Sequence, residues 1–457
     1  QAILRDKTRL RRPLKDRFAL VQHDWDWAEF APGNLQVETL LKCAHQVRAG
    51  EQDPWMLLGY STYWAASEGF KKMKRGEFPD RNRLGPGGRD WGHATDIFHI
   101  PERLDDWENF VLEMMRKAGR HVTGWILWNT PDSNNSLGVP PKKFAQMIKL
   151  TDKWRRRYCP EIPLVIGGMG RDTAIPYLEE IRKEGAIDGI TGVNLRIDAG
   201  ITSPEDGKLV DYIEDLRDVL NQSDADQSKI KNQKSEILLT DLDWACERSG
   251  SGGLDAFDQA AYLARATFLL DRLGVRPTMV LANEDETRLG FGMIYKKTLE
   301  VPPMRQKLPA YQFKPVWYGM TRVKKMLDEI KVGGEVAIQD IVPGRTRCML
   351  YERKSDRKPV AIVWRNNEPG EVSFEATGMS VATAEDIFGS APTNRKGWFD
   401  VGKMPTVFVL NPAKESAARS LTRLRVRDAG NEPSWPFRVI ASFKPETGTP
   451  YKYTTTA

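Results

Sequence analysis

Residues 124–132 read GWILWNTPD, in which an apolar run from Trp125 to Trp128 stops at a polar tetrapeptide. Four bulky apolar residues in succession are typical of a strand that is buried on both faces, as in a parallel sheet. The Asn-Thr-Pro-Asp segment would then lie where that strand ends. Because ligands of parallel α/β sheets bind at the carboxyl ends of the strands, Asn129, Thr130 and Asp132 become candidate site residues.

The same pattern recurs over the first 330 residues, where short apolar segments alternate with amphipathic ones. This alternation predicts a parallel sheet with helices outside it. The predicted strands are Phe18–Gln22, Trp55–Tyr60, Gly124–Trp128, Leu164–Gly167, Gly189–Leu195, Glu236–Thr240 and Thr278–Ala282. The predicted helices are Leu104–Lys117, Phe144–Tyr158, Thr173–Glu184, Gly207–Asn221, Ala256–Leu273 and Pro315–Ile330.

The number of strand–helix units favours a (β/α)8 TIM barrel at residues 1–330, with the weak segment Ile3–Leu4 as a further strand. A doubly wound sheet is the alternative, and it would bind a nucleotide through a G-x-G-x-x-G turn after a strand. The only glycine-rich turn after a predicted strand is IGGMGRD at 166–172, which lacks that pattern. We interpret its glycines as a tight turn, and the barrel is preferred.

After residue 331 the predicted elements become short alternating strands separated by turns, which indicates an antiparallel β-sandwich at 331–411. The strands are Val336–Ile341, Arg347–Glu352, Val360–Trp364, Glu371–Ala376 and Thr406–Leu410. Residues 412–457 contain the further strand patterns LRVRD and FRVIASF. This β-rich tail either completes the sandwich or begins another β module.

The chain has 457 residues and a formal net charge of +6. Its dense basic run KWRRR at 153–157 falls on a predicted helix and is interpreted as a solvated face, and no nucleic-acid-binding motif accompanies it. The four cysteines show no C-x-x-C spacing, so neither a zinc knuckle nor a disulfide framework is indicated. No apolar stretch of about 18 residues predicts a membrane span. Localisation and oligomeric state stay open, with a secreted or cell-surface location favoured for a glycan-directed protein.

Asp, Asn and aromatic residues follow the predicted strands, at the rim where a barrel carries its active site. Carboxylates and amides hydrogen-bond hydroxyl groups and aromatic faces stack on sugar rings, so this rim predicts an oligosaccharide or polysaccharide partner. The candidate substrate-binding residues are His23, Asp24, Trp25, Tyr60, Trp64, Trp128, Asn129, Asn194, Trp244, Asn283 and Glu284. The acidic clusters at 24–26 and 284–286 lack calcium-loop spacing, so we expect neither a metal nor another cofactor.

Several segments together resemble the clan of (β/α)8 retaining glycoside hydrolases that includes β-xylosidases and α-L-iduronidases. GWILWNTPD at 124–132 resembles the clan's W-E-x-W-N-E-P-D, and ILLTDLDW at 237–244 resembles its I-x-x-T-E-x-G-W. Other segments match the clan in order: DWDWAEFAPGNLQ, DPWMLLGYSTYWAA, LDDWENFVLEMMRKAG and PAYQFKPVWYGMTRV in the barrel. VAIVWRNN and AEDIFG resemble strands of the attached β-sandwich, so the resemblance extends over residues 18 to about 410. It implies a glycan cleft at the barrel mouth, with Asn129 on the sugar 2-hydroxyl.

Both catalytic glutamates of the clan are substituted, since the acid/base position is Thr130 and the nucleophile position is Asp241. Retaining hydrolysis needs two carboxylates about 5–5.5 Å apart. Threonine has no titratable proton near neutral pH, and aspartate is one methylene shorter than glutamate. These departures argue against the clan's standard mechanism.

Three interpretations stay open. An active hydrolase could use Asp241 with a relocated acid, and a wider carboxylate pair would then imply inversion. The candidates for that acid are Asp132, Asp24, Asp243 and Glu284. Alternatively the barrel is a pseudoenzyme that binds glycan or acts as a scaffold. In the third interpretation the substrate activates its own leaving group.

Overall fold

The structure is a computed structural model. It describes residues 18–21, 35, 37–50, 52–59, 61–62, 65–66, 100–133, 138–198, 202–221, 236–244, 254–277, 294–295, 312–338, 344–366 and 368–428. The chain divides into two compact units, Gln1–Val332 and Gly333–Ala457. No helix of the described part is both long and apolar enough to cross a membrane.

The first unit is built on a seven-stranded sheet whose strands follow one another in chain order. They are β1 (Phe18–Val21), β2 (Asp53–Leu58), β3 (Gly124–Leu127), β4 (Leu164–Gly170), β5 (Gly192–Asp198), β6 (Glu236–Asp243) and β7 (Arg276–Pro277). All six pairings between neighbours are parallel. A doubly wound sheet reverses its strand order at a switch point, so the observed order excludes that alternative for these strands.

The parallel sheet curls. Cα atoms of β4 and β6 approach within 8 Å of each other although β5 lies between them. Two strand spacings of about 4.8 Å would keep these atoms farther apart in a flat sheet. Apolar side chains of β2, β3, β4 and β6 accordingly meet in one buried cluster. The sequence-predicted strands at Ile3–Leu4 and Thr278–Ala282 lie outside the described residues.

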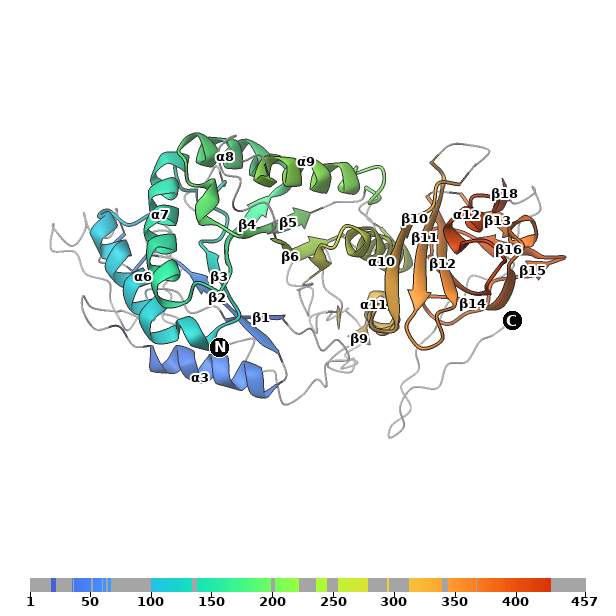
Figure 1. The fold of residues 1–457 in the computed structure, drawn as a ribbon, viewed down its shortest axis with the longest axis horizontal. Coiled ribbons are helices and arrows are strands. Elements are labelled where there is room, and N and C mark those ends of the chain that lie inside the picture. Colours follow the sequence, from blue (N-terminus) through green and yellow to red (C-terminus); the bar gives the residue numbers. More distant parts are fainter. Residues whose placement is uncertain are drawn as a thin grey trace, which may run out of the picture. The chain divides into compact units, whose positions relative to one another are not determined.

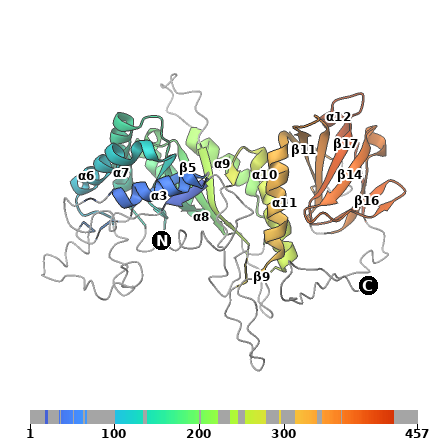
Figure 2. The same cartoon turned by 90° about the horizontal axis from the view of Figure 1, so that it is seen from below.

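The helices predicted between Leu104 and Ile330 are all present, with ends that agree to within three residues. They are α6 (Leu104–Ala118), α7 (Pro141–Tyr158), α8 (Arg171–Lys183), α9 (Leu209–Asn221), α10 (Ala256–Arg272) and α11 (Pro315–Glu329), and α3 (Glu38–Ala49) precedes them. Helices α6 to α9 form an arc outside the strands (Figures 1 and 2). Each buries one apolar stripe, such as Trp107, Phe110 and Met114 of α6, as the helical period requires.

The second unit consists of two sheets whose established pairings are antiparallel. One contains β10 (Ile330–Glu335), β11 (Thr346–Arg353), β12 (Pro359–Arg365), β17 (Thr406–Asn411) and β14 (Ser380–Asp386). The other contains β15 (Asn394–Arg395), β16 (Trp398–Val401), β13 (Gly370–Ser373) and β18 (Arg425–Asp428). Side chains from both sheets share one core, in which the rings of Phe374 and Phe408 lie 4.8 Å apart.

The second unit contains β14, β15 and β16, which are not among the predicted strands, and it also differs from the sequence expectation at its first and last strands. The strand predicted at Val336–Ile341 lies earlier, at β10, because Gly333 lets the chain approach Leu350 of β11 closely. The LRVRD segment forms β18, which pairs with β13 and so adds to the same unit after the short helix α12 (Ala417–Leu421). The FRVIASF segment lies outside the described residues.

Candidate functional site at the carboxyl ends of the strands

The segment that follows β3 is hydrogen-bonded to both neighbouring strands, β2 and β4. The amide of Trp128 donates to the carbonyl of Leu58 at 2.8 Å, and the amide of Thr130 donates to the carbonyl of Gly167 at 3.0 Å. Trp128 and Thr130 both adopt left-handed backbone conformations, with φ of 58° and 55°. For residues with a Cβ this conformation costs roughly 1–2 kcal/mol each. Such strain is concentrated at functional sites, where the surrounding structure must impose it.

Two glycines of β4 make room for this segment. A Cβ on Gly167 would lie 2.2 Å from Cγ2 of Ile126, and one on Gly168 would lie 1.6 Å from Oδ1 of Asn129. Gly168 also has a φ of +66°. The Asn129 side chain therefore lies directly against the backbone of β4. This explains the IGGMGRD motif better than a tight turn does, and the pair of adjacent glycines was the sequence signal for it.

Thr130 occupies the position that resembles the acid/base of glycoside hydrolases. Its Oγ1 is buried and has no hydrogen-bond partner among the described residues. Leaving a buried hydroxyl unsatisfied costs about 1–3 kcal/mol. A hydroxyl can donate one hydrogen bond and accept others, so it suits a sugar hydroxyl as partner.

Asp132 was the nearest candidate for a relocated acid, and the structure places it in an anchoring role. Its Oδ2 accepts a hydrogen bond at 2.8 Å from the amide of Gly170, which precedes α8, and another from the hydroxyl of Thr173. The side chain is buried. The carboxylate thus ties the segment after β3 to the first turn of α8, where the helix dipole favours negative charge.

Burial is the largest influence on the Asp132 carboxyl, and it raises its pKa. The hydrogen bonds from Thr173 and Gly170 and the charge of Arg196 act in the opposite direction without cancelling it. A raised pKa is what a general acid requires, although an anchored carboxyl can have one for structural reasons alone.

Asp241, which resembles the nucleophile position, lies within β6. Its Cα is paired with that of Arg196 across the β5–β6 ladder. The register shifts just before this pair, since Leu195 is paired with Leu239 and Thr240 is the extra residue. Beta strands β4 and β5 separate β6 from β3 in the sheet.

Two aromatic candidates are core residues, which corrects the prediction that they stack on a sugar. Trp128 is 0% exposed and lies edge-to-face against Trp107. Trp244 is 1% exposed, and its Nε1 donates to the carbonyl of Thr202 at 2.7 Å. Indoles without an exposed face have no surface to offer a pyranose ring.

Asn194 of β5 is also buried, and its Nδ2 lies 3.7 Å from where a Cβ on Gly167 would be. Asn129 and Asn194 therefore flank the two glycines from neighbouring strands. The other predicted binding residues lie outside the described residues: His23, Asp24, Trp25, Tyr60, Trp64, Asn283 and Glu284. Within the part of the chain that is described, no three His, Cys, Asp or Glu residues gather as metal ligands.

No protein-family model matches the sequence, and a search of curated proteins finds no match. Among solved structures, the chain is similar to a family 39 glycoside hydrolase from the gut symbiont Bacteroides cellulosilyticus WH2. The identity is 15% and the TM-score 0.60, and the match covers 86% of this chain and 75% of that chain. A family 30 endoxylanase from Clostridium papyrosolvens C71 matches at 10% identity and a TM-score of 0.48, covering 86% of this chain and 89% of that one.

The first of these similarities establishes the class of fold. The chain has a glycoside hydrolase-like α/β fold with a parallel sheet, followed by a domain of antiparallel sheets. At this identity the likeness concerns the fold alone, and function has to be argued from the site.

Proposed function

We propose that the first unit binds an oligosaccharide at the carboxyl ends of its strands, with Asn129 and Thr130 as direct contacts. The observation that carries the proposal is the Thr130 hydroxyl, which has no hydrogen-bond partner among the described residues. Thr130 and the adjacent Asn129 are both partly exposed, and the backbone of Thr130 is strained. An isolated hydroxyl in this place is costly for the free protein, and a sugar hydroxyl would satisfy it. The glycoside hydrolase-like fold supports a carbohydrate as the ligand.

The same residues favour binding without cleavage. Thr130 cannot protonate a leaving group near neutral pH. Asp132, two residues farther along, is engaged by Gly170 and Thr173. A carboxyl that anchors a helix terminus through hydrogen bonds is poorly placed to move a proton repeatedly. We therefore favour a glycan-binding pseudoenzyme.

Slow hydrolysis is the second candidate, and the raised pKa of Asp132 favours it. In this alternative Asp132 is the acid and Asp241 is the second carboxylate. Because Asp241 replaces a longer glutamate, its reacting oxygen would retreat by about 1 Å, and a misplacement of that size can cost roughly a hundredfold in rate.

Isothermal titration with neutral oligosaccharides tests the binding proposal. Thr130→Val removes the hydroxyl but keeps a β-branched side chain of similar volume. Since one hydrogen bond is worth about 1 kcal/mol, we expect this variant to bind the preferred oligosaccharide about fivefold to tenfold more weakly. Thr383→Val, at an exposed position of β14, is the matched control and should bind as the unaltered protein does. Equal affinity of all three proteins would refute the role of Thr130.

A hydrolysis screen on the same sugars separates the two candidates. Binding without turnover supports the pseudoenzyme. Turnover that disappears in both Asp241→Asn and Asp132→Asn would establish the hydrolase instead.

A further inference from the structure

The net charge of helix α7 equals that of the whole chain. Its 18 residues, PKKFAQMIKLTDKWRRRY, include seven basic residues and one acidic residue, a net charge of +6. The formal net charge of the complete chain is also +6, so the rest of the sequence is balanced. A concentration of one sign on one element creates a local field that attracts the opposite charge.

The exposed residues of α7 form a single stripe. They are Lys142, Gln146, Lys149, Lys153, Arg156 and Arg157, so every exposed residue except one is cationic. Lys142, Gln146, Lys149 and Lys153 follow at intervals of three and four residues, and Arg156 and Arg157 are three and four residues beyond Lys153, which places all six on one face of the helix. At a rise of 1.5 Å per residue the stripe is about 22 Å long. We call these six residues the α7 stripe.

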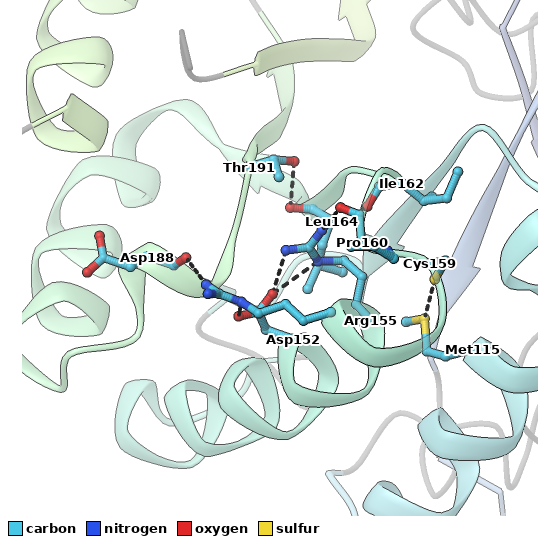
Figure 3. Close-up of polar contacts among 10 residues, drawn as sticks. Met115, Asp152, Arg155, Cys159, Pro160, Ile162, Leu164, Asp188 and Thr191 are labelled. Atoms are coloured by element: carbon cyan, nitrogen blue, oxygen red, sulfur yellow. Dashed lines mark hydrogen bonds and ion pairs between the residues drawn. The ribbon is translucent and has the colours of Figure 1, made fainter. Parts of the chain in front are cut away.

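Two arginines of the KWRRR run serve the fold. Arg155 is buried and binds Asp152 and the carbonyls of Pro160 and Ile162, as Figure 3 shows. Arg156 donates to the second carboxylate oxygen of Asp152 at 2.6 Å and to the carbonyl of Asp188 at 3.2 Å. The expectation that the whole run is a solvated face is therefore wrong for Arg155. Asp152, the only acidic residue of α7, therefore binds Arg155 through one carboxylate oxygen and Arg156 through the other.

Arg157 is different. Its guanidinium lies 5.8 Å from the ring centroid of Trp154 and 5.7 Å from that of Tyr158, and the two rings stack 6.2 Å apart. It has no ion pair or hydrogen bond with any residue in the described part of the chain, and it is exposed. A guanidinium held by aromatic faces keeps its forked donors available for a planar anion such as a carboxylate.

The remaining cations of the stripe are only partly neutralised. Lys149 donates to a backbone carbonyl, that of Glu184, which leaves its charge uncompensated. Lys142 has no ion pair with a described residue. Lys153 pairs with Glu108 of α6 at 2.6 Å, and the same carboxylate oxygen accepts from Nε1 of Trp154. Glu108 thereby orients the aromatic end of the stripe.

We propose that the α7 stripe binds an acidic polysaccharide, with carboxylates of successive sugars on the cations and Trp154 and Tyr158 beside the sugar rings. Apart from Arg156, whose charge is paired with Asp152, the cations of the stripe are Lys142, Lys149, Lys153 and Arg157. They follow one another at intervals of seven, four and four residues, which is about 6–10 Å along the helix axis. Duplex DNA carries one charge per about 1.7 Å of its axis, which is far denser. A linear glycan with one carboxylate per sugar matches the sparse row better.

This surface is separate from the Asn129–Thr130 site. In a strand–helix–strand unit the helix runs antiparallel to the strands. The carboxyl end of α7 is followed directly by β4, which begins at Leu164, so Trp154, Arg157 and Tyr158 lie toward the amino ends of the strands. The two proposed sites are therefore tested by different variants, and either proposal can be refuted without the other.

Binding of the full chain to immobilised polygalacturonate tests the proposal, with neutral xylan and duplex DNA as the comparison ligands. We expect binding to polygalacturonate that weakens as salt is added. The triple variant K142Q/K149Q/R157Q should bind at least about tenfold more weakly, because three contacts between a cation and a carboxylate are lost. A matched control, K354Q/R395Q/K396Q, removes the same charge from exposed positions of the second unit and should bind within about twofold of the unaltered protein.

Two further measurements make the test specific. Arg157→Lys keeps the charge but loses the planar fork, so its affinity should fall between those of the unaltered protein and the triple variant. Thr383→Val, which belongs to neither proposed site, should bind polygalacturonate as the unaltered protein does. Equal binding by the two triple variants, or tighter binding of duplex DNA than of polygalacturonate, would overturn the proposal. Thermal unfolding of each variant confirms that it is folded.

Discussion

At the scale of single residues, Thr130 combines a left-handed backbone with a buried hydroxyl that no described residue satisfies. Neither feature benefits the unliganded fold, since a β-branched residue is disfavoured at positive φ. Gly168 of the neighbouring strand β4 has to be a glycine, because any Cβ there would collide with Asn129. Hydrogen bonds to the neighbouring strands therefore hold the segment after β3 in a backbone conformation that Trp128 and Thr130 disfavour.

Asp132 gives a prediction on pH. Burial, the largest cause, raises the pKa of its carboxyl above the ordinary value of 3.8. The folded protein then holds this proton more tightly than the unfolded chain does, so the contribution to stability is complete below about pH 4 and is lost as the pH rises through the folded-state pKa. Asp132→Asn has no such titration.

Chemical denaturation of the unaltered protein and of Asp132→Asn between pH 4 and pH 8 measures this effect. The free energy of unfolding of the Asn variant should improve relative to the unaltered protein as the pH rises. A difference that stays constant over this range would show that the carboxyl is not shifted upward.

At the scale of elements, the segment before α9 is attached to α10 by a buried ion pair. Glu205 and Arg265 form a two-pronged pair whose side chains are 4% and 0% exposed. The guanidinium also lies 5.0 Å from the ring centroid of Tyr262, which packs against Trp244. This cluster explains why Trp244, at the end of β6, belongs to the core.

Removal of one partner from this pair should be costly, because the other charge stays buried. We expect Glu205→Ala to lower the free energy of unfolding by about 3–5 kcal/mol. The matched control is Glu180→Ala, which breaks the exposed pair with Lys183 and should cost less than about 1 kcal/mol. Similar losses in urea denaturation for both variants would contradict the structural role of the buried pair.

Two strands that the sequence did not predict at their observed positions are the edge strands of the larger sheet of the second unit. β14 reads SVATAED and lies at the edge of its sheet, with most side chains partly or fully exposed. β10 reads IKVGGE and is the other edge strand. Edge strands need no alternation of apolar residues, because their neighbours in the sheet define them. Helices α6 to α9, in contrast, each bury a stripe whose period is visible in the sequence.

At the scale of the whole molecule, the second unit depends on residues beyond the sequence-predicted boundary at 411. Leu421, Leu424 and Val426 are buried in the core that the two sheets share. The buried guanidinium of Arg365 pairs with Asp428 at 2.8 Å. β18 is therefore a required strand of this unit.

Two truncations test this requirement. Deletion of residues 412–457 removes three buried apolar side chains and leaves Arg365 without Asp428, a loss of at least about 5 kcal/mol. We expect the calorimetric transition of the second unit to disappear. Deletion of residues 429–457 only is the control and should retain that transition. Retention of the transition in both truncated chains would contradict the requirement for β18.

The sequence by itself determined strands β1 to β6, helices α6 to α11 and the polar segment after GWILW, because hydropathic periodicity and strand ends are local properties of the chain. Only the tertiary structure decided which side chains are exposed and free of protein partners, and so able to contact a ligand. Asp132 is anchored to α8, Trp128 and Trp244 are buried, and of the three consecutive arginines only Arg157 lacks an ion pair or hydrogen bond with the residues described. Burial and partners come from segments that are far apart in sequence, so no local pattern could have assigned them.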